Sequence, residues 1–521
     1  MSRASFAKPR MPMTGEEFLA SLRDEREVWV YGERVRDVTA HPAFRNVARM
    51  LARLYDALHD PDTQPVLTAP TDTGSGGCTH KFFRSPRSVE DLRGARDAIA
   101  TWARMSYGWL GRSPDYKSSF LATLDSNAEF YAPYEANARR WYREAQEQVL
   151  FFNHAIVNPP INRGLPPHES RDVFVHVQKE TDRGIVVSGA KVVATGSALT
   201  NYTFISQYAT LPIQDEALAL AFIVPTGARG VKLLCRPSYA MTAGVMGSPF
   251  DYPLSSRFDE NDAILVLEDV LVPWEDVLIY RDIERAQQFL PRSGFAPRAF
   301  FHGCVRLSVK LEFIAGLLLR GVEVMGNKDF RGVQAEVGEV MAWRNVFSGL
   351  ADAMVHAPTP WKDGTVLPNA EYAMTYRALA PSIYPRIKGI LEKVLASSLV
   401  YVPSHAIDFE VPELRRHLDR IARGSDGSSA LERAKLMKLT WDAVGTEFGG
   451  RHELYERSYG GNEENCLVEL LHTAAAAGAA ERCKELVARC MADYDEKGWT
   501  APDLIDAKDI SLFGGRAGAP R

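Results

Sequence analysis

The sequence predicts an α+β protein of several domains: a helical domain, a β-barrel or sandwich domain and a helical bundle, in this order. The chain has 521 residues, of which 46% are hydrophobic and 24% are charged, and this length suits two to four structural domains. Apolar residues repeat at helical spacing toward both ends, and short β-rich runs fill the middle. We therefore expect domains at residues 1–156, 157–281 and 282–498, followed by a tail at 499–521.

The first of these domains shows mainly helical periodicity. Residues 40–58 (AHPAFRNVARMLARLYDAL) and 89–110 place apolar side chains along one face of a helix. Another helix is expected to begin at Ser113, because Ser caps a helix, Pro114 suits the first helical position and Asp115 places an acid in the first turn.

The middle of the chain changes to short β-rich runs bounded by Gly, Pro or Asp. Residues 172–178 (DVFVHVQ) alternate in polarity, and residues 184–195 (GIVVSGAKVVAT) predict two strands joined at Ser188-Gly189. Further strands are expected at residues 218–225, 231–235 and 263–272. Short strands in succession favour a barrel or sandwich over alternating β-α units.

Long apolar stripes mark the third domain and predict a bundle of helices. They lie at residues 305–326, 333–353, 372–399, 428–448 and 463–493. A cleft between a β domain and such a bundle is a natural place for a cofactor. The polar tail is expected to lie on a neighbouring subunit or to be loose.

Composition argues against several classes of protein. The net charge is -5 and basic residues are interspersed with acids, so no nucleic-acid partner is expected. No apolar run reaches the ~18 residues of a membrane span, and the first residues lack the apolar core of a signal peptide, so a cytoplasmic location is expected. The six scattered cysteines and the histidine spacing predict neither disulfides nor a structural metal.

The common cofactor motifs are missing from the sequence. There is no Gly-x-Gly-x-x-Gly between a strand and a helix, and the glycine-rich residues 73–77 lack the Lys-Ser/Thr of a phosphate loop. There is also no Gly-x-Ser-x-Gly elbow. An enzyme with this chain holds its cofactor in another way or uses none.

Seven stretches, in order along the chain, resemble the large component of the 4-hydroxyphenylacetate 3-monooxygenase family, whose relatives include coumarate and tyrosine-derivative 3-hydroxylases of natural-product pathways. The resemblance extends from about residue 11 to about residue 503. The stretches are residues 13–19 (MTGEEFL), 111–117 (GRSPDYK), 152–160 (FNHAIVNPP), 188–195 (SGAKVVAT), 247–257 (GSPFDYPLSSR), 330–334 (FRGVQ) and 449–455 (GGRHELY).

This resemblance implies an acyl-CoA dehydrogenase-like fold with a C-terminal four-helix bundle, assembled as a homotetramer made of two dimers. It also implies that the chain binds FAD in its reduced form, FADH2, which a separate NAD(P)H:flavin reductase supplies. Through a flavin hydroperoxide formed with molecular oxygen, such an enzyme converts a para-substituted phenol to a catechol.

Arg112, Tyr116 and His154 match the phenol-binding residues of the family. Phenolate is a better nucleophile than phenol, and full ionisation at pH 7 requires about 4 kcal/mol, since a free phenol has a pKa near ~10. By the resemblance, Arg112 faces the peroxide, Tyr116 positions the substrate and His154 is the best candidate to accept the phenol proton. From the residues alone, the structural alternatives are favoured: Arg112 and Tyr116 flank a helix start, where an Arg is more often a surface residue, and His154 could be a satisfied core histidine.

The resemblance also suggests flavin contacts. Asn153, Thr195 and Ser197 would face the isoalloxazine ring, and Arg331 and Gln334 would reach the diphosphate from a neighbouring subunit. The turn at residues 458–462 (SYGGN) would bring Gly460, Gly461 and Asn462 near the flavin, where bare backbone permits close approach. Each of these residues has an alternative role in shaping a helix or a turn.

The loop at residues 206–216 (SQYATLPIQDE) should cover the para substituent of the substrate. It is shorter than in the 4-hydroxyphenylacetate enzymes of the family, which favours a coumarate or a tyrosine derivative, either free or tethered to a carrier protein. The residues taken to contact the substrate are Ser206, Gln207, Tyr208, Ala209 and Thr210.

Three other functions fit parts of this pattern. An acyl-CoA dehydrogenase would share the fold but would need a carboxylate base and would bind FAD tightly, and the Arg112, Tyr116 and His154 trio has no role in that reaction. A halophenol hydroxylase of the same superfamily would differ in the lining of its pocket. A non-catalytic binding protein would be expected to lack the trio.

Overall fold

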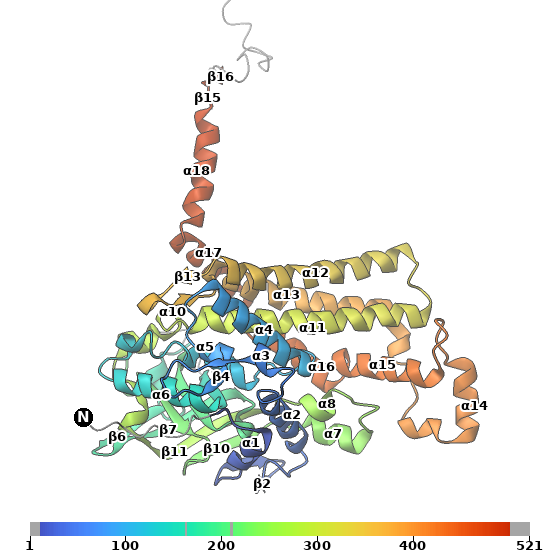
Figure 1. The fold of residues 1–521 in the computed structure, drawn as a ribbon, viewed down its shortest axis with the longest axis horizontal. Coiled ribbons are helices and arrows are strands. Elements are labelled where there is room, and N and C mark those ends of the chain that lie inside the picture. Colours follow the sequence, from blue (N-terminus) through green and yellow to red (C-terminus); the bar gives the residue numbers. More distant parts are fainter. Residues whose placement is uncertain (1–10, 162–163, 209–211, 497, 501–521) are drawn as a thin grey trace, which may run out of the picture. The chain divides into compact units, whose positions relative to one another are not determined.

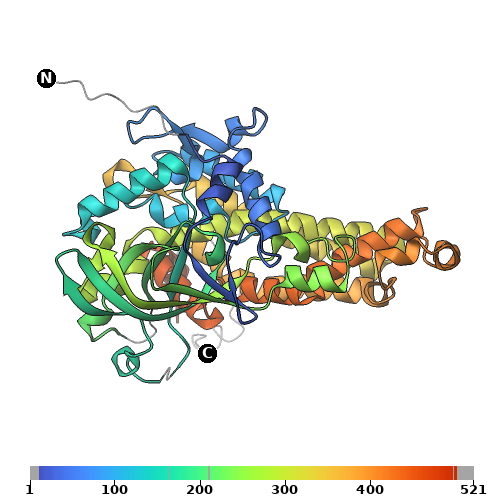
Figure 2. The same cartoon turned by 90° about the horizontal axis from the view of Figure 1, so that it is seen from below.

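The computed structural model describes residues 11–161, 164–208, 212–496 and 498–500. The chain divides into two compact units, Met1–Gly460 and Gly461–Arg521. The first unit contains a large sheet, the helices that cover it and a helical bundle, and Figures 1 and 2 show the strands grouped beside one end of the bundle.

Short helices build the N-terminal part of the first unit. The expected helix start at residue 113 is realised as a 3-10 turn, η2 (Pro114–Lys117), that leads directly into α5. Ser113 donates its hydroxyl hydrogen bond to the Asp115 side chain and does not cap the backbone. The helices of this part are α1 (Gly15–Ser21), α2 (Arg45–Asp56), α3 (Gln64–Leu67), α4 (Val89–Met105), α5 (Ser118–Leu121) and α6 (Glu135–Gln148).

Ten strands of the described chain form one mixed sheet in the order β12-β9-β8-β5-β7-β11-β10-β1-β2, with β6 paired to β7. The pairs β1–β10 and β5–β8 are parallel, and the other pairs are antiparallel. The strands are β1 (Glu27–Val30), β2 (Glu33–Val35), β5 (Phe152–Val157), β6 (His176–Thr181), β7 (Gly184–Thr195), β8 (Tyr202–Tyr208), β9 (Leu220–Pro225), β10 (Val231–Cys235), β11 (Asp262–Pro273) and β12 (Val277–Tyr280).

The sheet differs from the sequence prediction in two respects. Strands β1, β2 and β5 come wholly or largely from the part expected to be helical, because runs of three to six residues are too short to show a clear period. The predicted hairpin at Ser188-Gly189 is wrong, since β7 runs unbroken through it. Gly189 has φ +123, and a Cβ there would lie 2.3 Å from the Phe174 carbonyl oxygen, so this glycine permits a close strand approach and makes no turn.

A four-helix bundle completes the first unit, as the sequence predicts. Its central member α11 (Phe295–Met325) packs against α12 (Arg331–His356), α13 (Ala370–Leu395) and α15 (Ala430–Val444), and α16 (Glu447–Ser458) extends the last position. Apolar side chains line α11 along most of its length, and these form the bundle core. The remaining helices are α7 (Tyr239–Met246), α8 (Ser255–Phe258), α9 (Ile283–Gln287), α10 (Phe289–Arg292) and α14 (Pro412–Ile421).

The described part of the second unit contains two helices, α17 (Glu463–Ala476) and α18 (Ala479–Ala492), where the sequence predicted a single stripe at residues 463–493. Gly478 separates them with φ +73, a left-handed conformation that ends one helix before the next begins. Within the described ranges, no helix is long and apolar enough to cross a membrane, and no group of His, Cys, Asp and Glu is arranged to hold a metal ion.

Candidate active site

Arg112 lies in the loop between α4 and η2, where its guanidinium is surrounded by aromatic rings. Its Nη1 donates a 2.6 Å hydrogen bond to Tyr455 Oη. Its Cζ lies 4.2 Å from the ring centroid of Tyr116 and 5.0 Å from those of Tyr455 and Tyr459. Burial opposes the charge, but the three tyrosines raise the pKa of Arg112 above its ordinary value. The site therefore carries a fixed positive charge.

Tyr116 is buried and lies among four charged or polar side chains, with which it forms what we term the Tyr116 cluster: Arg112, Lys117, His154 and His302. Its ring centroid lies 5.9 Å from that of His154, 5.3 Å from that of His302 and 4.4 Å from Lys117 Nζ. The loop around η2, strand β5 and helix α11 each supply part of this cluster. The structure thus brings together Arg112, Tyr116 and His154, which are dispersed over more than 40 positions of the sequence.

His154 projects from β5, where it pairs with Phe204 of the parallel strand β8. Its Nδ1 is buried and has no hydrogen-bond partner within the described ranges. Burial, and then the charges of Lys117 and Arg112, hold the pKa of His154 well below its ordinary value. The imidazole is therefore neutral at pH 7, and its Nδ1 can form a hydrogen bond with a ligand.

Carboxylates bind the backbone of Arg112, the guanidinium of the neighbouring Arg451 and one of the predicted flavin residues. Glu260 accepts a hydrogen bond from the Arg112 backbone N–H. Asp262 accepts hydrogen bonds from Arg451 Nη2 at 2.7 Å and from Thr195 Oγ1 at 2.5 Å. Burial opposes ionisation of Asp262, but Arg451 and Arg236 lower its pKa well below the ordinary range, so its orienting role persists at every physiological pH.

The three residues predicted to face a flavin ring are all buried. They differ in whether their side chains already form a hydrogen bond within the protein. Thr195 Oγ1 is bonded to Asp262, and Ser197 Oγ donates to the Ala194 carbonyl at 2.8 Å. The Asn153 Nδ2 has no hydrogen-bond partner in the described part of the chain. Asn153 is therefore the member of this set with a donor available for a ligand.

Arg331 and Gln334 are exposed in the first turn of α12. The length of α11 between His302 and Met325, about 35 Å at 1.5 Å per residue, separates them from the Tyr116 cluster of the same chain. They therefore do not join the Tyr116 cluster within one chain.

The predicted glycine turn is divided between the two units. The Gly460 carbonyl accepts a 2.5 Å hydrogen bond from Arg377 Nε in the first unit. Gly461 and Asn462 belong to the second unit, where Asn462 caps α17 by accepting from the backbone of Glu464 at 2.9 Å.

The predicted substrate residues begin on β8. Ser206 lies two residues beyond Phe204, where the register between β5 and β8 is irregular, and its buried Oγ has no hydrogen-bond partner among residues the structure describes. Gln207 is also buried. Tyr208 ends β8, with its backbone paired to Val157. Ala209 and Thr210 lie outside the described residues.

A buried lysine fixes the base of this substrate segment. Lys191 Nζ donates to Gln207 Oε1 at 2.8 Å and to Asn158 Oδ1 at 2.7 Å, and it has no carboxylate partner among the described residues. Burial lowers the pKa of Lys191 to about 7. The lysine can therefore change charge near neutral pH beside the predicted substrate residues.

We expect Lys191 to make stability depend on pH. Between pH 7 and about 10, the unfolded chain binds a proton at Lys191 that the folded chain does not, so stability rises with pH by up to about 1.4 kcal/mol per unit. Thermal unfolding of wild type and Lys191→Met should show a difference that moves in favour of wild type as pH rises. Lys179→Met, at an exposed position on β6, is the control; equal pH slopes in both comparisons would contradict this role.

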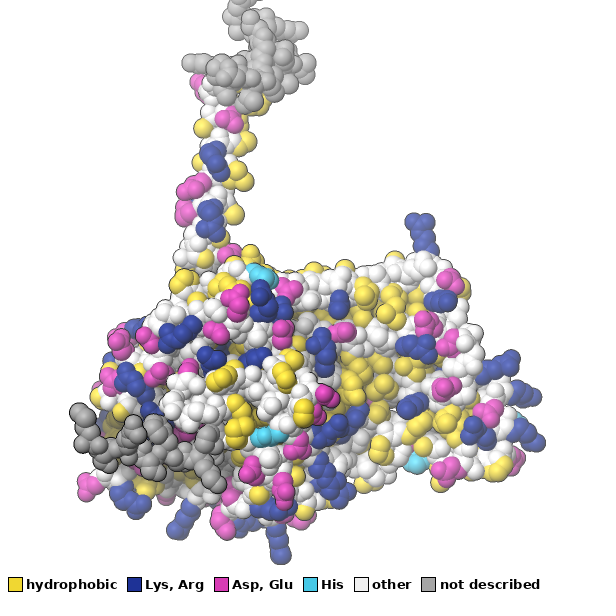
Figure 3. All heavy atoms as spheres, in the orientation of Figure 1, with side chains coloured by type: hydrophobic (Ala, Val, Ile, Leu, Met, Phe, Trp, Pro, Cys, Tyr) yellow, Lys and Arg dark blue, Asp and Glu magenta, His cyan; other side chains and the backbone are white. Residues whose placement is uncertain are grey.

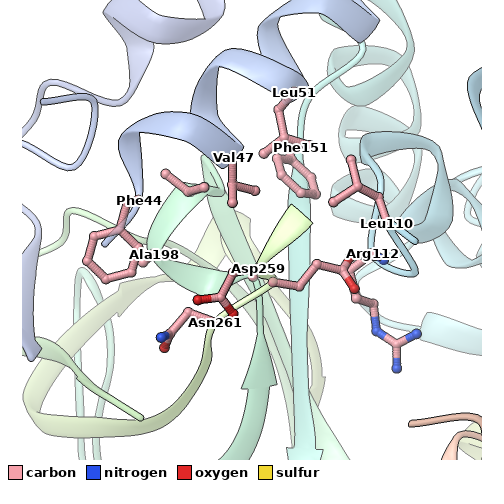
Figure 4. Close-up of a pocket in the computed structure, with 12 residues that line it drawn as sticks. Phe44, Val47, Leu51, Leu110, Arg112, Phe151, Ala198, Asp259 and Asn261 are labelled. Carbon is pink, nitrogen blue, oxygen red and sulfur yellow. Dashed lines mark hydrogen bonds between the residues drawn. The ribbon is translucent and has the colours of Figure 1, made fainter. Parts of the chain in front are cut away.

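A small pocket is lined in part by Arg112 of the cluster (Figure 4). Apolar side chains such as Val47, Leu51 and Phe151 line one wall, and Asp259 and Asn261 line another. In Figure 4 the Arg112 guanidinium points away from the apolar side chains. Arg112 therefore borders this pocket while its charge faces the Tyr116 cluster.

Lys117, His302, Tyr455 and Tyr459 also lie in the site, although the sequence did not single them out. Lys117 and Tyr455 fall inside the matched stretches 111–117 and 449–455, which was the available signal. His302 lies on a long apolar helix, where a histidine in the sequence gives no sign that it meets Asp115 at 3.2 Å.

The unpaired polar atoms of the site suit a flavin and a phenol. Lys117 Nζ, Asn153 Nδ2 and His154 Nδ1 are buried without partners in the described ranges. Leaving a buried donor unpaired costs about 1–3 kcal/mol, which a ligand with matching acceptors would recover. A flavin ring presents oxygen and nitrogen acceptors along its edge, and a phenol presents one oxygen, so the residues present fit FAD and a phenolic substrate.

The fold is acyl-CoA dehydrogenase-like, and its site gathers an arginine, a tyrosine and a histidine in one buried cluster. Residues 14–279 match the 4-hydroxyphenylacetate 3-hydroxylase N-terminal family, and residues 286–488 match the corresponding C-terminal family. The chain belongs to the 4-hydroxyphenylacetate 3-hydroxylase family.

Relatives match over nearly the whole chain. A monooxygenase of Streptomyces globisporus that acts on (3S)-3-amino-3-(3-chloro-4-hydroxyphenyl)propanoyl carried by a peptidyl-carrier protein is 58% identical, covering 95% of this chain and 93% of that protein. The oxygenase component of a Rhodococcus 4-nitrophenol 2-monooxygenase is 56% identical, with coverage of 97% and 96%. A crystal structure of a 4-hydroxyphenylacetate 3-monooxygenase oxygenase component with FAD and 4-hydroxyphenylacetate is 32% identical, with a TM-score of 0.85 and coverage of 92% and 99%.

Proposed function

We propose that this chain is the oxygenase component of a two-component monooxygenase that uses reduced FAD and molecular oxygen to hydroxylate a para-substituted phenol beside its existing hydroxyl group. One observation carries the proposal: Arg112, Tyr116 and His154 converge in a single buried cluster. The family membership and the monooxygenase relatives support the same reaction.

The residues of the cluster prepare the phenol for attack. Arg112 carries a fixed charge that stabilises phenolate over phenol, and the required ~4 kcal/mol is of the order that charge-assisted hydrogen bonds supply where water is excluded. Tyr116 and the neutral His154 hold the phenol oxygen in place. Reduced FAD, when bound, activates molecular oxygen for transfer to the adjacent ring carbon.

Asn153, Thr195 and Ser197 would meet the flavin ring, with Thr195 oriented by Asp262. Arg331 and Gln334 of a second copy would reach the diphosphate, and residues 460–462 would approach the flavin through bare backbone. Exposure of Arg331 and its distance from the cluster of its own chain support this division between copies.

The partner is a separate NAD(P)H:flavin reductase, as the designation oxygenase component of the Rhodococcus relative supports. The chain assembles as a homotetramer made of two dimers. Figure 3 shows hydrophobic side chains gathered over the bundle; exposed apolar residues there include Leu319 on α11, Val346 on α12 and Phe330, which precedes α12. Exposed apolar surface of this kind marks protein interfaces.

The para substituent is covered by residues 206–216, and a coumarate or tyrosine derivative is the favoured substrate class. The Streptomyces relative supports a substrate that is tethered to a carrier protein. A cytoplasmic location is consistent with supply of the flavin by a reductase.

The direct test is aerobic turnover with FAD, NADH and an unrelated flavin reductase. We expect catechol formation from at least one of L-tyrosine, p-coumarate, 4-hydroxyphenylacetate and 4-nitrophenol, and no product when the reductase is omitted. If reduced FAD binds but no free phenol reacts, the substrate is larger or carrier-tethered. Failure of the chain to bind reduced FAD would contradict the proposed function.

A further inference from the structure

Lys117 is a buried amine that the trio does not explain. It ends η2 with 1% of its surface exposed, and its Nζ has no hydrogen-bond or ion-pair partner within the described ranges. The atom lies 4.4 Å from the ring centroid of Tyr116 and 4.4 Å from that of Phe295, the first residue of α11. Both rings also approach His154, at 5.9 and 6.2 Å. The amine thus lies within the cluster proposed to hold the phenol.

No carboxylate pairs with Lys117 in the described residues. On its own loop it faces the cation of Arg112 and the ring of Tyr116. Asp115 is two residues away, where its Oδ1 contacts His302 and Ser113; its Oδ2 has no hydrogen-bond partner in the described residues, and the carboxylate forms no ion pair with Lys117. From β5 it faces the imidazole of His154, and from α11 the apolar ring of Phe295.

The balance of interaction energies favours the neutral form of the Lys117 amine. Contact with aromatic rings stabilises a desolvated ammonium by about 2 kcal/mol, whereas burial of an unpaired ion costs several kcal/mol. In agreement, burial and the charge of Arg112 lower the pKa of Lys117 well below its ordinary value. A neutral lysine has a lone pair, and no described protein donor occupies it.

We propose that Lys117, rather than His154, accepts the proton of the phenolic substrate. This step rests on the proposed function. The O–H bond of the phenol breaks, an N–H bond forms at Lys117 Nζ, and the electron pair of the O–H bond remains on the oxygen. Amine and phenol become an ammonium and phenolate pair with no change in net charge, so the transfer suits a dry site. His154 then contributes a hydrogen bond and keeps its neutral state.

Measuring whether bound phenol is ionised, and how many protons are released on binding, tests this proposal without turnover. 4-Nitrophenol is bound anaerobically in the presence of reduced FAD, one pH unit below the pKa of the free phenol, and its phenolate absorption band reports ionisation. Calorimetric titration in two buffers of different ionisation enthalpy reports how many protons leave the complex. For wild type we expect the phenolate band with no net proton release, because the proton stays on Lys117.

Two variants separate a proton acceptor from a mere counter-ion. Lys117→Met should bind the probe as neutral phenol, with the phenolate band appearing at least one pH unit higher and kcat/KM lowered by about 10²-fold or more. Lys117→Arg keeps a charge but lacks a lone pair, so its phenolate should form with release of about one proton. Thermal unfolding of each variant checks that the fold is retained.

The outcomes are distinct. Phenolate with one proton released from wild type would show that Lys117 was charged before binding and would overturn the proposal. Neutral phenol bound to wild type would overturn it too, while catechol formation in the turnover assay would leave the proposed function intact. No binding of the probe, together with no turnover of any phenol, would contradict both.

Discussion

Replacement of Arg112 by Met is expected to lower kcat/KM for phenol hydroxylation by about 10²- to 10³-fold, the loss typical of removing one preorganised donor from a site of charge development. The guanidinium faces Tyr116 at 4.2 Å and is fixed by the 2.6 Å hydrogen bond to Tyr455. Without the guanidinium, the remaining residues would have to supply the full ~4 kcal/mol needed to ionise the phenol. Steady-state kinetics with saturating reduced FAD measure the effect.

Three further variants locate the cause of this loss. Arg112→Lys keeps the charge but loses the planar fork, so its activity should fall between those of wild type and Arg112→Met. Tyr455→Phe removes the hydrogen bond that orients the guanidinium. It should lower kcat/KM by about 10-fold, the equivalent of one hydrogen bond to a charged group. Arg416→Met, at an exposed position on α14, is the matched control. Wild-type kinetics for Arg112→Met would remove Arg112 from the site.

Replacement of Glu456 by Gln is expected to lower the free energy of unfolding by about 3–5 kcal/mol, because it leaves buried cations unpaired. The carboxylate of Glu456 accepts from Arg306 Nη2 at 2.7 Å and from Lys310 Nζ at 2.9 Å, and all three side chains are buried. These residues join α11 to α16, the helix that carries Tyr455. The variant should therefore also position Arg112 less firmly. Thermal unfolding measures the loss of stability, and kcat/KM measures the effect on the site.

Glu453→Gln is the control for this prediction. Glu453 lies one turn earlier on α16, is partly exposed and pairs with Lys388 at 3.1 Å, so its loss should cost no more than about 1 kcal/mol. Equal destabilisation by both variants would contradict a special role for the buried cluster.

Acid should erase the difference between wild type and Glu456→Gln. Burial opposes ionisation of Glu456, but Arg306 and Lys310 hold its pKa at about 2, below the ordinary value of 4.5. A carboxyl with a lowered pKa contributes its full stability above pH 4.5 and loses it as pH falls toward 2. Unfolding of the two proteins measured across this window should converge.

The sequence alone singled out Arg112, Tyr116 and His154 as candidate site residues because they fall in short local segments. Residues 111–117 carry Arg112, Tyr116 and Lys117 in one loop, and residues 152–160 carry Asn153 and His154 on one strand. The predicted hairpin at Ser188-Gly189 was wrong because Gly189 permits the close approach of the Phe174 backbone, and Phe174 is distant in the sequence. The separation of α17 from α18 was missed because a single glycine does not interrupt an apolar stripe.

What the sequence determined was the order of helical, β and bundle elements and the local motifs, since periodicity and spacing are properties of neighbouring residues. Tertiary structure alone decided that His302 and Tyr459 approach Tyr116 and that Tyr455 aims Arg112. It also decided that Lys117 and His154 lose their water and their ordinary pKa values. Burial and the charges that surround a group set its protonation, and both arise only when segments distant in the sequence pack together.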